Sequence, residues 1–362
     1  MRLMFQKGKK MDEAIRPYRP AEDKKKILEL FKVVWGADSS NTQVAVWDWK
    51  FERNPANASR QPVIVVADSA EKIIGMVARL PFRLKFGQDI LTVFWSVDFI
   101  THPDYRGEIG LKLGRETSHQ KEPLLGFPLG PVKLFWKRYH SRPFAQVYSY
   151  VHIVDIRHLI RRKCANRFVL AACHYVWQGV RAMTAFLGPR CGSDVDIAEI
   201  TAFGPEIDVL WKEASVDYQF LQVRDRAYLT WRFLECPHKK YRIFLARRQG
   251  MALGYIVIRD EEKNGLHYGY IVDIFIRKGE SHGLLGLLLK AVKALETQGV
   301  DVITCYMVEH HKMYVAALRQ AGFIFRKLSL TGMIFDKEGV LSGDSLVKDG
   351  WFLTRGDSDL DM

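Results

Sequence analysis

The chain has 362 residues, of which 48% are hydrophobic, and a formal net charge of +13. This length exceeds what one core usually organises, and the apolar content suffices for two packed domains, which excludes a disordered or fibrous chain. We find neither the long apolar stretch of a membrane-spanning helix nor a signal peptide, so we expect a cytoplasmic protein.

The basic excess attracts anions, among which CoA, a nucleotide-sugar, an acidic glycan, a nucleic acid and an anionic membrane surface all qualify. Nucleic acid is the less favoured partner, because we find no helix-turn-helix, zinc-finger or RNA-recognition signature. The five cysteines are scattered without a close pair, which indicates neither a disulfide framework nor a metal site.

Apolar periodicity and turn residues predict the elements of the first part of the chain. A strand at 15–18 precedes helices over 20–35 and 47–51. Three antiparallel strands follow at 63–67, 73–86 and 90–101. Then come a helix over 109–120, a buried strand at 124–128, a helix over 132–139 and a strand at 146–156.

The segment 96–110 is the most informative part of the chain. An apolar strand stops at a turn that contains Pro103, Arg106 and Gly107, and a helix opens close to Gly110. Glycines let the backbone approach an anion, and the first amides of a helix point at it. An arginine in the turn adds a charge-assisted hydrogen bond. The sequence therefore predicts a cradle for a pyrophosphate.

This segment resembles the acyl-CoA-binding segment of the GNAT (GCN5-related N-acetyltransferase) superfamily, in which a His-Pro-x-Tyr-Arg-Gly turn leads into a glycine-rich loop and a helix. The chain departs from that pattern as if one glycine had been deleted, so we expect the loop to be one amide tighter. The resemblance implies that acetyl-CoA is the cosubstrate. It also implies that the following residues bind it: Phe99, Ile100, Thr101, Arg106, Gly107, Glu108, Ile109, Gly110, Leu111 and Lys112.

A second signal is an internal repeat. The motif Trp49-Lys50-Phe51 reappears as Trp231-Arg232-Phe233, and the same order of strands and turns follows each copy. This recurrence predicts two diverged copies of one fold. The central strand of the second copy runs into the segment 276–283, which lacks the Arg-Gly-x-Gly pattern, so we expect this copy to bind CoA poorly or not at all.

The predicted order of elements is the GNAT order, so we predict an α/β (α+β) chain with two GNAT-like domains, each a mostly antiparallel twisted sheet flanked by helices. We place an N-terminal domain with the cradle at 12–160, a helical linker at 161–195, a degenerate C-terminal domain at 196–340 and a tail at 341–362. The tail and the run 124–128 resemble tandem GNAT proteins linked to bacterial polysaccharide synthesis, although Leu129 stands where those proteins commonly have Asn.

Acetyl transfer to an amine needs a group that removes the proton from the amine. Asp98, near the end of the central strand, is the first candidate for this base or for binding the amine. The alternative is a structural carboxylate, because Asp273 occupies the matching place in the second copy. His102 has a suitable intrinsic pKa, although a histidine in a turn is more often a structural hydrogen-bonding residue.

Many GNAT proteins have a tyrosine that protonates the departing thiolate, and Phe135 and Leu318 fill those places here. Tyr139, one helical turn beyond Phe135, is a substitute candidate; the alternative is a residue of the core or its rim. A CoA thiolate can also leave without full protonation, so the missing tyrosine does not exclude turnover.

Three interpretations of function remain at this stage. The first is an N-acetyltransferase that acts on a small-molecule amine such as an amino sugar or a nucleotide-sugar, with the second copy forming one wall of the recipient site. The second is a Fem-type transferase, which moves an aminoacyl group from tRNA. The third is a catalytically silent binding protein. CoA binding separates the first interpretation from the other two.

Overall fold

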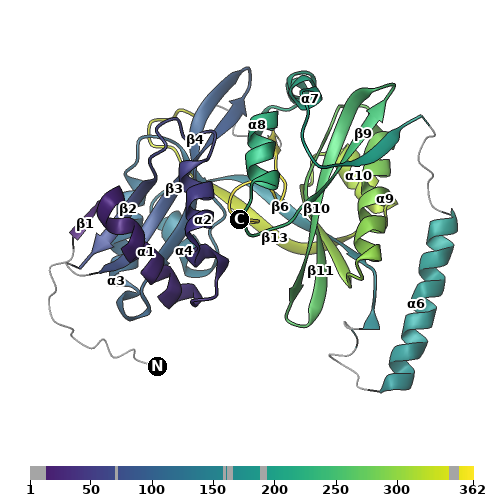
Figure 1. The fold of residues 1–362 in the computed structure, drawn as a ribbon, viewed down its shortest axis with the longest axis horizontal. Coiled ribbons are helices and arrows are strands. Elements are labelled where there is room, and N and C mark those ends of the chain that lie inside the picture. Colours follow the sequence, from purple (N-terminus) through teal and green to yellow (C-terminus); the bar gives the residue numbers. More distant parts are fainter. Residues whose placement is uncertain (1–13, 70–71, 158–159, 161–165, 188–193, 342–349) are drawn as a thin grey trace.

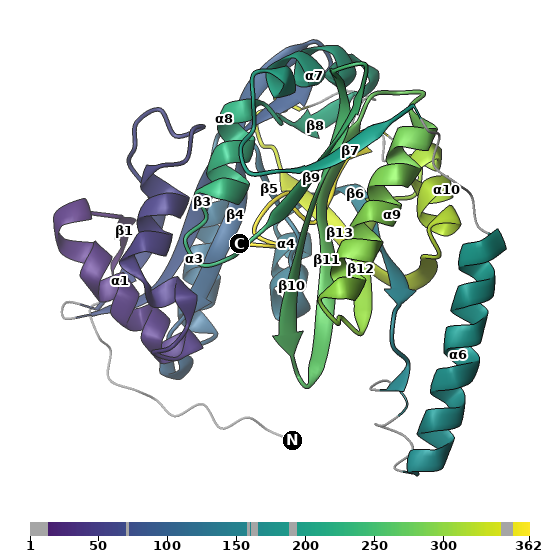
Figure 2. The same cartoon turned by 45° about the vertical axis from the view of Figure 1, so that its right-hand side comes forward.

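The computed structural model describes the chain except for residues 1–13, 70–71, 158–159, 161–165, 188–193 and 342–349 (Figure 1). Within the described residues, a 14-stranded, mostly antiparallel sheet runs through both halves of the molecule. Figures 1 and 2 show the two halves side by side, with the C-terminal end of the chain between them.

The first half follows the predicted order closely. Its elements are β1 (Ala14–Pro17), α1 (Pro20–Trp35), α2 (Val44–Trp47), β2 (Val63–Asp68), β3 (Ile73–Phe86), β4 (Asp89–Thr101), α3 (Glu108–Ser118), β5 (Leu124–Gly126), α4 (Gly130–Arg138) and β6 (Arg142–Ile153). The predicted helix over 47–51 is the end of α2 followed by a π-helical turn, Asp48–Glu52. Strand β6 begins four residues before the predicted position 146.

The second half repeats this order after a long helix, α6 (Arg167–Leu187). Its elements are β7 (Asp196–Ile200), α7 (Glu206–Ala214), β8 (Phe220–Gln222), α8 (Arg226–Leu229), β9 (Arg242–Arg248), β10 (Met251–Lys263), β11 (Leu266–Ile276), α9 (Ser281–Thr297), β12 (Val302–Val308), α10 (Lys312–Gln320), β13 (Ile324–Phe335) and β14 (Trp351–Phe352). The start of the predicted linker helix at 164 lies outside the described residues.

Helices cover both faces of the sheet in the first half. On one face, α1 buries Ile27 and Phe31 with residues of β2 and β3. On the other face, α3 buries Ile109 and Leu113. Gly75 lets α3 approach, because a Cβ at this position would lie 2.8 Å from the Leu113 side chain. Burying each of these large apolar side chains stabilises the fold by roughly 1.5–3 kcal/mol.

The two halves exchange their last strands. Strand β6 pairs with β12 of the second half, and β13 lies between β5 and β6. The strand order is therefore β1-β2-β3-β4-β5-β13 on one side and β6-β12-β11-β10-β9-β7 on the other. Each half needs the other half to complete its sheet.

The repeated Trp-Lys/Arg-Phe motifs meet where the two halves join. Each motif lies on a π-helical turn, Asp48–Glu52 in the first half and Thr230–Leu234 in the second. The Trp49 indole N–H donates to the Trp231 carbonyl at 2.7 Å, and the Trp231 indole N–H donates to the Trp49 carbonyl at 2.8 Å. The rings stack with centroids 5.2 Å apart. The sequence repeat thus corresponds to a local two-fold pairing.

The first prediction concerns this pair. Replacing Trp49 by Phe leaves the buried Trp231 carbonyl without its donor, and we expect a loss of about 1–3 kcal/mol in the free energy of unfolding. Trp231→Phe costs a similar amount. Because the rings are in contact, the double variant should deviate from additivity by more than about 0.5 kcal/mol in urea denaturation.

Trp177→Phe on α6 is the matched control, and its cost should add to that of Trp49→Phe without coupling. Additive costs for the Trp49 and Trp231 variants would contradict a joint role for the two indoles.

Candidate active site

The first half contains an open cavity beside its central strand. Strands β4 and β5 pair only at Phe94↔Leu124 and Trp95↔Leu125 and then diverge. Beyond Trp95, no described strand continues the sheet on this side of β4. A cavity of 340 Å³ lies here. It is lined by β4, the segment after β5, α4 and the C-terminal segment, through Ser96, Val97, Asp98, Phe99, Gly126, Phe127, Pro128, Leu129, Val132, Trp136, Asp359 and Leu360.

The predicted cradle follows directly from β4. A 3-10 turn, Pro103–Tyr105, connects β4 to α3, and Gly107 precedes the first residue of that helix. Gly107 has φ +102° and ψ −83°, which residues with a side chain rarely adopt. The first amides of α3 have no partners within the helix and carry the positive end of its dipole. Arg106 is exposed beside them. This geometry suits an anion.

Asp98 lines the cavity and has a cationic partner. It lies in a β-bulge, where the β3–β4 register shifts, and it has φ +49°. Such a bulge changes the direction in which a side chain points. The Lys50 ammonium lies 2.8 Å from the Asp98 carboxylate, and both side chains are nearly buried. Lys50 comes from the Trp-Lys-Phe motif, so this motif joins the halves and also holds Asp98.

Asp359 is a second carboxylate in the cavity. The sequence motifs did not identify it as a candidate catalytic residue. The residue lines the cavity and is accessible from it. Desolvation by the surrounding protein raises the pKa of Asp359. The charge of the Lys50 ammonium lowers this pKa, and the charge of the Asp98 carboxylate raises it. The Asp359 carboxylate forms no ion pair with another described side chain. The alternation of aspartates at 357, 359 and 361 is the sequence signal that could have pointed to it.

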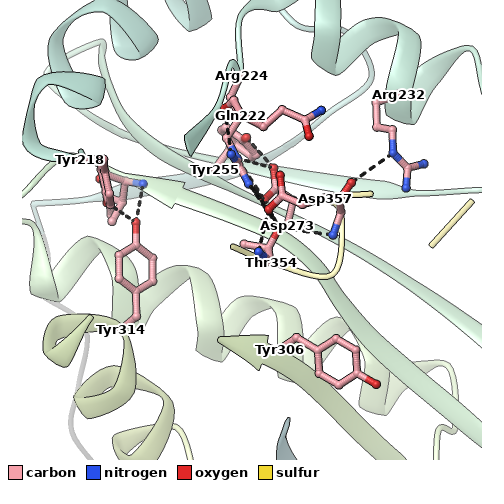
Figure 3. Close-up of polar contacts among 12 residues, drawn as sticks. Tyr218, Gln222, Arg224, Arg232, Tyr255, Asp273, Tyr306, Tyr314, Thr354 and Asp357 are labelled. Carbon is pink, nitrogen blue, oxygen red and sulfur yellow. Dashed lines mark hydrogen bonds and ion pairs between the residues drawn. The ribbon is translucent and has the colours of Figure 1, made fainter. Parts of the chain in front are cut away.

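A buried network fixes the C-terminal segment before Asp359 (Figure 3). The Asp273 carboxylate accepts hydrogen bonds from the Tyr255 hydroxyl at 2.7 Å and the Thr354 hydroxyl at 2.8 Å. Arg224 donates to Asp273 at 3.2 Å and to Asp357 at 2.8 Å. The three side chains that donate to Asp273, those of Arg224, Tyr255 and Thr354, thus hold it in a structural network. The counterpart of Asp98 in the second half is therefore a structural carboxylate.

Asp361 fixes the segment on the other side of Asp359. Its carboxylate accepts hydrogen bonds from Arg259 at 2.6 Å, Arg355 at 3.1 Å and the Tyr241 hydroxyl at 2.9 Å. Although burial alone would raise it, the hydrogen bonds and charge of Arg259 bring the pKa of Asp361 down to about 2. Asp359 therefore lies between two anchored aspartates, which position it in the cavity.

The equivalent place in the second half is filled. Gly356 donates its N–H to the Val272 carbonyl at 2.7 Å, at the point where β11 and β12 diverge. The Tyr314 hydroxyl accepts the Ile276 N–H at 3.2 Å and lies 2.7 Å from the Tyr218 hydroxyl (Figure 3). A cavity of only 170 Å³ remains nearby, lined in part by Lys278 and His311. The open edge of β4 thus has no equivalent along β11.

Two predicted catalytic residues lie outside the cavity lining. The His102 ring accepts the Asp104 N–H at 3.3 Å and packs edge-on against Tyr105, so it caps the turn after β4. Tyr139 follows α4 and packs on Phe135 with ring centroids 4.4 Å apart. Asp98 and Asp359 both line the cavity, and His102 and Tyr139 are not among its lining residues.

In the part of the chain that the structure describes, no group of three or more His, Cys, Asp and Glu side chains could hold a metal ion. No helix in this part of the chain is long and apolar enough to cross a membrane.

Comparisons with known proteins define the class of fold. Residues 14–112 match the family model of the acetyltransferase (GNAT) domain. No curated protein matches the chain. Among solved structures, a probable N-acyltransferase from Enterococcus faecalis V583 is similar, with a TM-score of 0.59 and 13% identity over 91% of this chain and 74% of that one.

Two further structures are also similar over both halves. A tandem GNAT protein from the clavulanic acid biosynthesis pathway is similar, with a TM-score of 0.55 and 14% identity over 89% of this chain and 98% of that one. Saccharomyces cerevisiae N-myristoyltransferase with bound myristoyl-CoA is similar, with a TM-score of 0.56 and 10% identity over 92% of this chain and 84% of that one. The predicted fold class is confirmed: the chain has a mixed α/β GNAT fold of tandem type.

The second prediction tests the anchoring of the C-terminal segment. The folded-state pKa of Asp361, about 2, lies below its unfolded value of about 3.9. Asp361 therefore stabilises the fold above about pH 4, and this contribution is lost as the pH falls from about 4 through 2. Asp361→Asn should lower the free energy of unfolding at neutral pH by about 3 kcal/mol, because Arg259 loses its buried partner.

The measurement is urea denaturation between pH 2 and 7. The control is Asp359→Asn, which removes a carboxylate without an ion pair and should retain the acid transition of the wild type. An unchanged pH dependence in Asp361→Asn would contradict this role of Asp361.

Proposed function

We propose that the chain is an acyl-CoA-dependent N-acetyltransferase with one active site, in its first half. The observation that supports this proposal best is the open edge of β4, which runs from the cavity at Asp98 toward the cradle at Gly107. One extended ligand with a phosphate end and a reactive end suits that arrangement. The filled edge of β11 favours a single site.

The residues present suit acetyl-CoA as the cosubstrate. In the proposal, Arg106 and the first amides of α3 bind its phosphates, and the unpaired edge of β4 from Phe99 to Thr101 binds its extended arm. Leu111 and Lys112 on the first turns of α3 flank this path. When bound, acetyl-CoA supplies an acetyl group activated as a thioester.

Asp359 acts as the proton acceptor in the proposed reaction. A protonated amine gives its proton to the Asp359 carboxylate and becomes nucleophilic. Its nitrogen forms a bond to the carbonyl carbon, the carbon–sulfur bond breaks, and the electron pair leaves with the CoA thiolate. The second proton of the attacking nitrogen passes to solvent or to that thiolate, which leaves a neutral amide. Backbone N–H groups of β4 polarise the carbonyl. Asp98, held by Lys50, orients the amine. His102 and Tyr139 have no step in this scheme.

The charges of the cavity indicate the kind of acceptor. Two carboxylates, Asp98 and Asp359, face one ammonium, Lys50, so the cavity favours a cationic amine. The net charge of the whole chain, +13, favours an anionic carrier of that amine. We therefore propose an amino sugar or an amino-substituted nucleotide-sugar as the acceptor, which would connect the enzyme to polysaccharide synthesis.

The third prediction is binding of acetyl-CoA at the cradle. Calorimetric titration of the wild-type protein should show micromolar binding at one site. Arg106→Ala should weaken it at least about tenfold, because one charge-assisted hydrogen bond to a phosphate is lost. Lys278→Ala, in the corresponding turn of the second half, is the matched control and should bind as the wild type does. No binding by the folded wild type would contradict the proposal and favour aminoacyl-tRNA or protein partners.

The fourth prediction concerns the pH dependence of turnover. Because the pKa of Asp359 is raised, kcat/KM should fall below a pH that lies above the ordinary range of a carboxylate. Asp359→Asn should lower kcat about 100-fold or more and remove this acidic limb. CoA release in the presence of acetyl-CoA and a panel of amino sugars gives the rates. Asp89→Asn, an exposed residue of the β3–β4 hairpin, is the control. Wild-type rates in Asp359→Asn would exclude Asp359 as the base.

A further inference from the structure

Helix α6 stands apart from the body of the molecule. It spans 21 residues, Arg167–Leu187. In both views it lies on the outside of the second half, beyond α9 (Figures 1 and 2). None of the steps proposed for acyl transfer involves it, so its presence needs a separate explanation.

One stripe of the helix faces the body. Leu170, Cys173, His174 and Trp177 recur at helical spacing and are half-buried. The His174 imidazole lies 3.4 Å from the Asp155 carboxylate, which follows β6. This ion pair links the half-buried stripe to the end of β6, and the opposite side of the helix is exposed.

The outward side of α6 is also apolar. Phe168, Val169, Tyr175 and Val176 are exposed by 72%, 44%, 75% and 67%. Ala171 and Ala172 lie among them and are exposed too. Monomeric proteins rarely expose contiguous apolar surface of this kind, and where they do it commonly marks a site that binds another molecule or a membrane.

The charge of the sequence around α6 indicates what kind of surface binds its exposed face. Residues 156–193 include seven Lys or Arg residues and no Asp or Glu. Two copies of this basic segment would repel each other, which disfavours a self-association through α6. An anionic bilayer attracts it, and amphipathic basic helices with aromatic residues lie in the lipid interface.

We propose that α6 binds the surface of an anionic lipid bilayer, with Phe168, Tyr175 and Val176 inserted below the headgroups. The helix axis then lies parallel to the membrane plane, and the positive charge of the sequence around it is attracted to the anionic surface. Binding brings the acyl-transfer site close to the membrane. The inference does not depend on the reaction proposed for the first half.

The experiment is co-flotation of the full-length protein with vesicles. One set contains equal parts phosphatidylglycerol and phosphatidylcholine, and the other contains phosphatidylcholine alone. The wild type should bind the anionic vesicles and not the neutral ones, and high salt should weaken the binding. Phe168→Glu/Tyr175→Glu/Val176→Glu should lower the partition coefficient about 100-fold, because it removes the inserted side chains and adds repulsion.

A matched triple variant controls for the added charge. Val209→Glu/Val216→Glu/Met251→Glu changes three residues that are exposed elsewhere on the second half. It adds the same negative charge and should change the partition coefficient by less than about threefold, since these sites lie outside the proposed contact. Thermal unfolding monitored by circular dichroism verifies that both triple variants are folded.

Three results would overturn the proposal. The first is no binding of the wild type to anionic vesicles. The second is an equal loss in both triple variants, which would indicate attraction by overall charge alone. The third is a lipid-free dimer, detected by light scattering, that the α6 variant converts to a monomer, which would show that a second copy covers the helix.

Discussion

The exchange of β6 and β13 is the constraint on which the rest of the structure depends. Because each half completes its sheet with the last strand of the other half, neither half can bury its core alone. The stacked pair Trp49 and Trp231, with its two reciprocal hydrogen bonds, fixes the halves at the join. Lys50 and Arg232, the next residues in the two motifs, are therefore held at fixed positions on either side of the same interface.

The two halves use these equivalent positions differently. Lys50 holds Asp98 at an open cavity, whereas Arg232 donates to the Gly356 carbonyl and holds the C-terminal segment in the second half (Figure 3). That segment occupies the diverging edge of β11 and then delivers Asp359 to the cavity beside β4. The duplicated fold thus has one sheet edge, along β11, that the C-terminal segment fills, and one, along β4, that stays open. The same segment supplies the Asp359 carboxylate to the open edge.

Local sequence patterns predicted most of the fold. The bounds of α1 and β3 agree with the expected 20–35 and 73–86, because their apolar periodicity, Pro20 and the hairpin turn at Gly87 are local signals. The exchange of the last strands could not be predicted in this way, because β6 has the same alternation whether it pairs within its own half or with β12. Asp98 was found because it lies near the end of a recognisable strand. Asp359 was not selected, because its importance depends on a long-range approach that Asp357 and Asp361 secure through buried ion pairs.

The central claim is that one half of a duplicated fold holds the acyl-CoA site and that the C-terminal segment completes it. Hydrogen–deuterium exchange of the full-length protein with and without acetyl-CoA tests this claim most directly. We expect slower exchange in peptides that cover 98–111 and 356–362, and unchanged exchange in peptides that cover 276–283. Protection at 276–283 without protection at 98–111 would place the ligand in the second half and contradict the account.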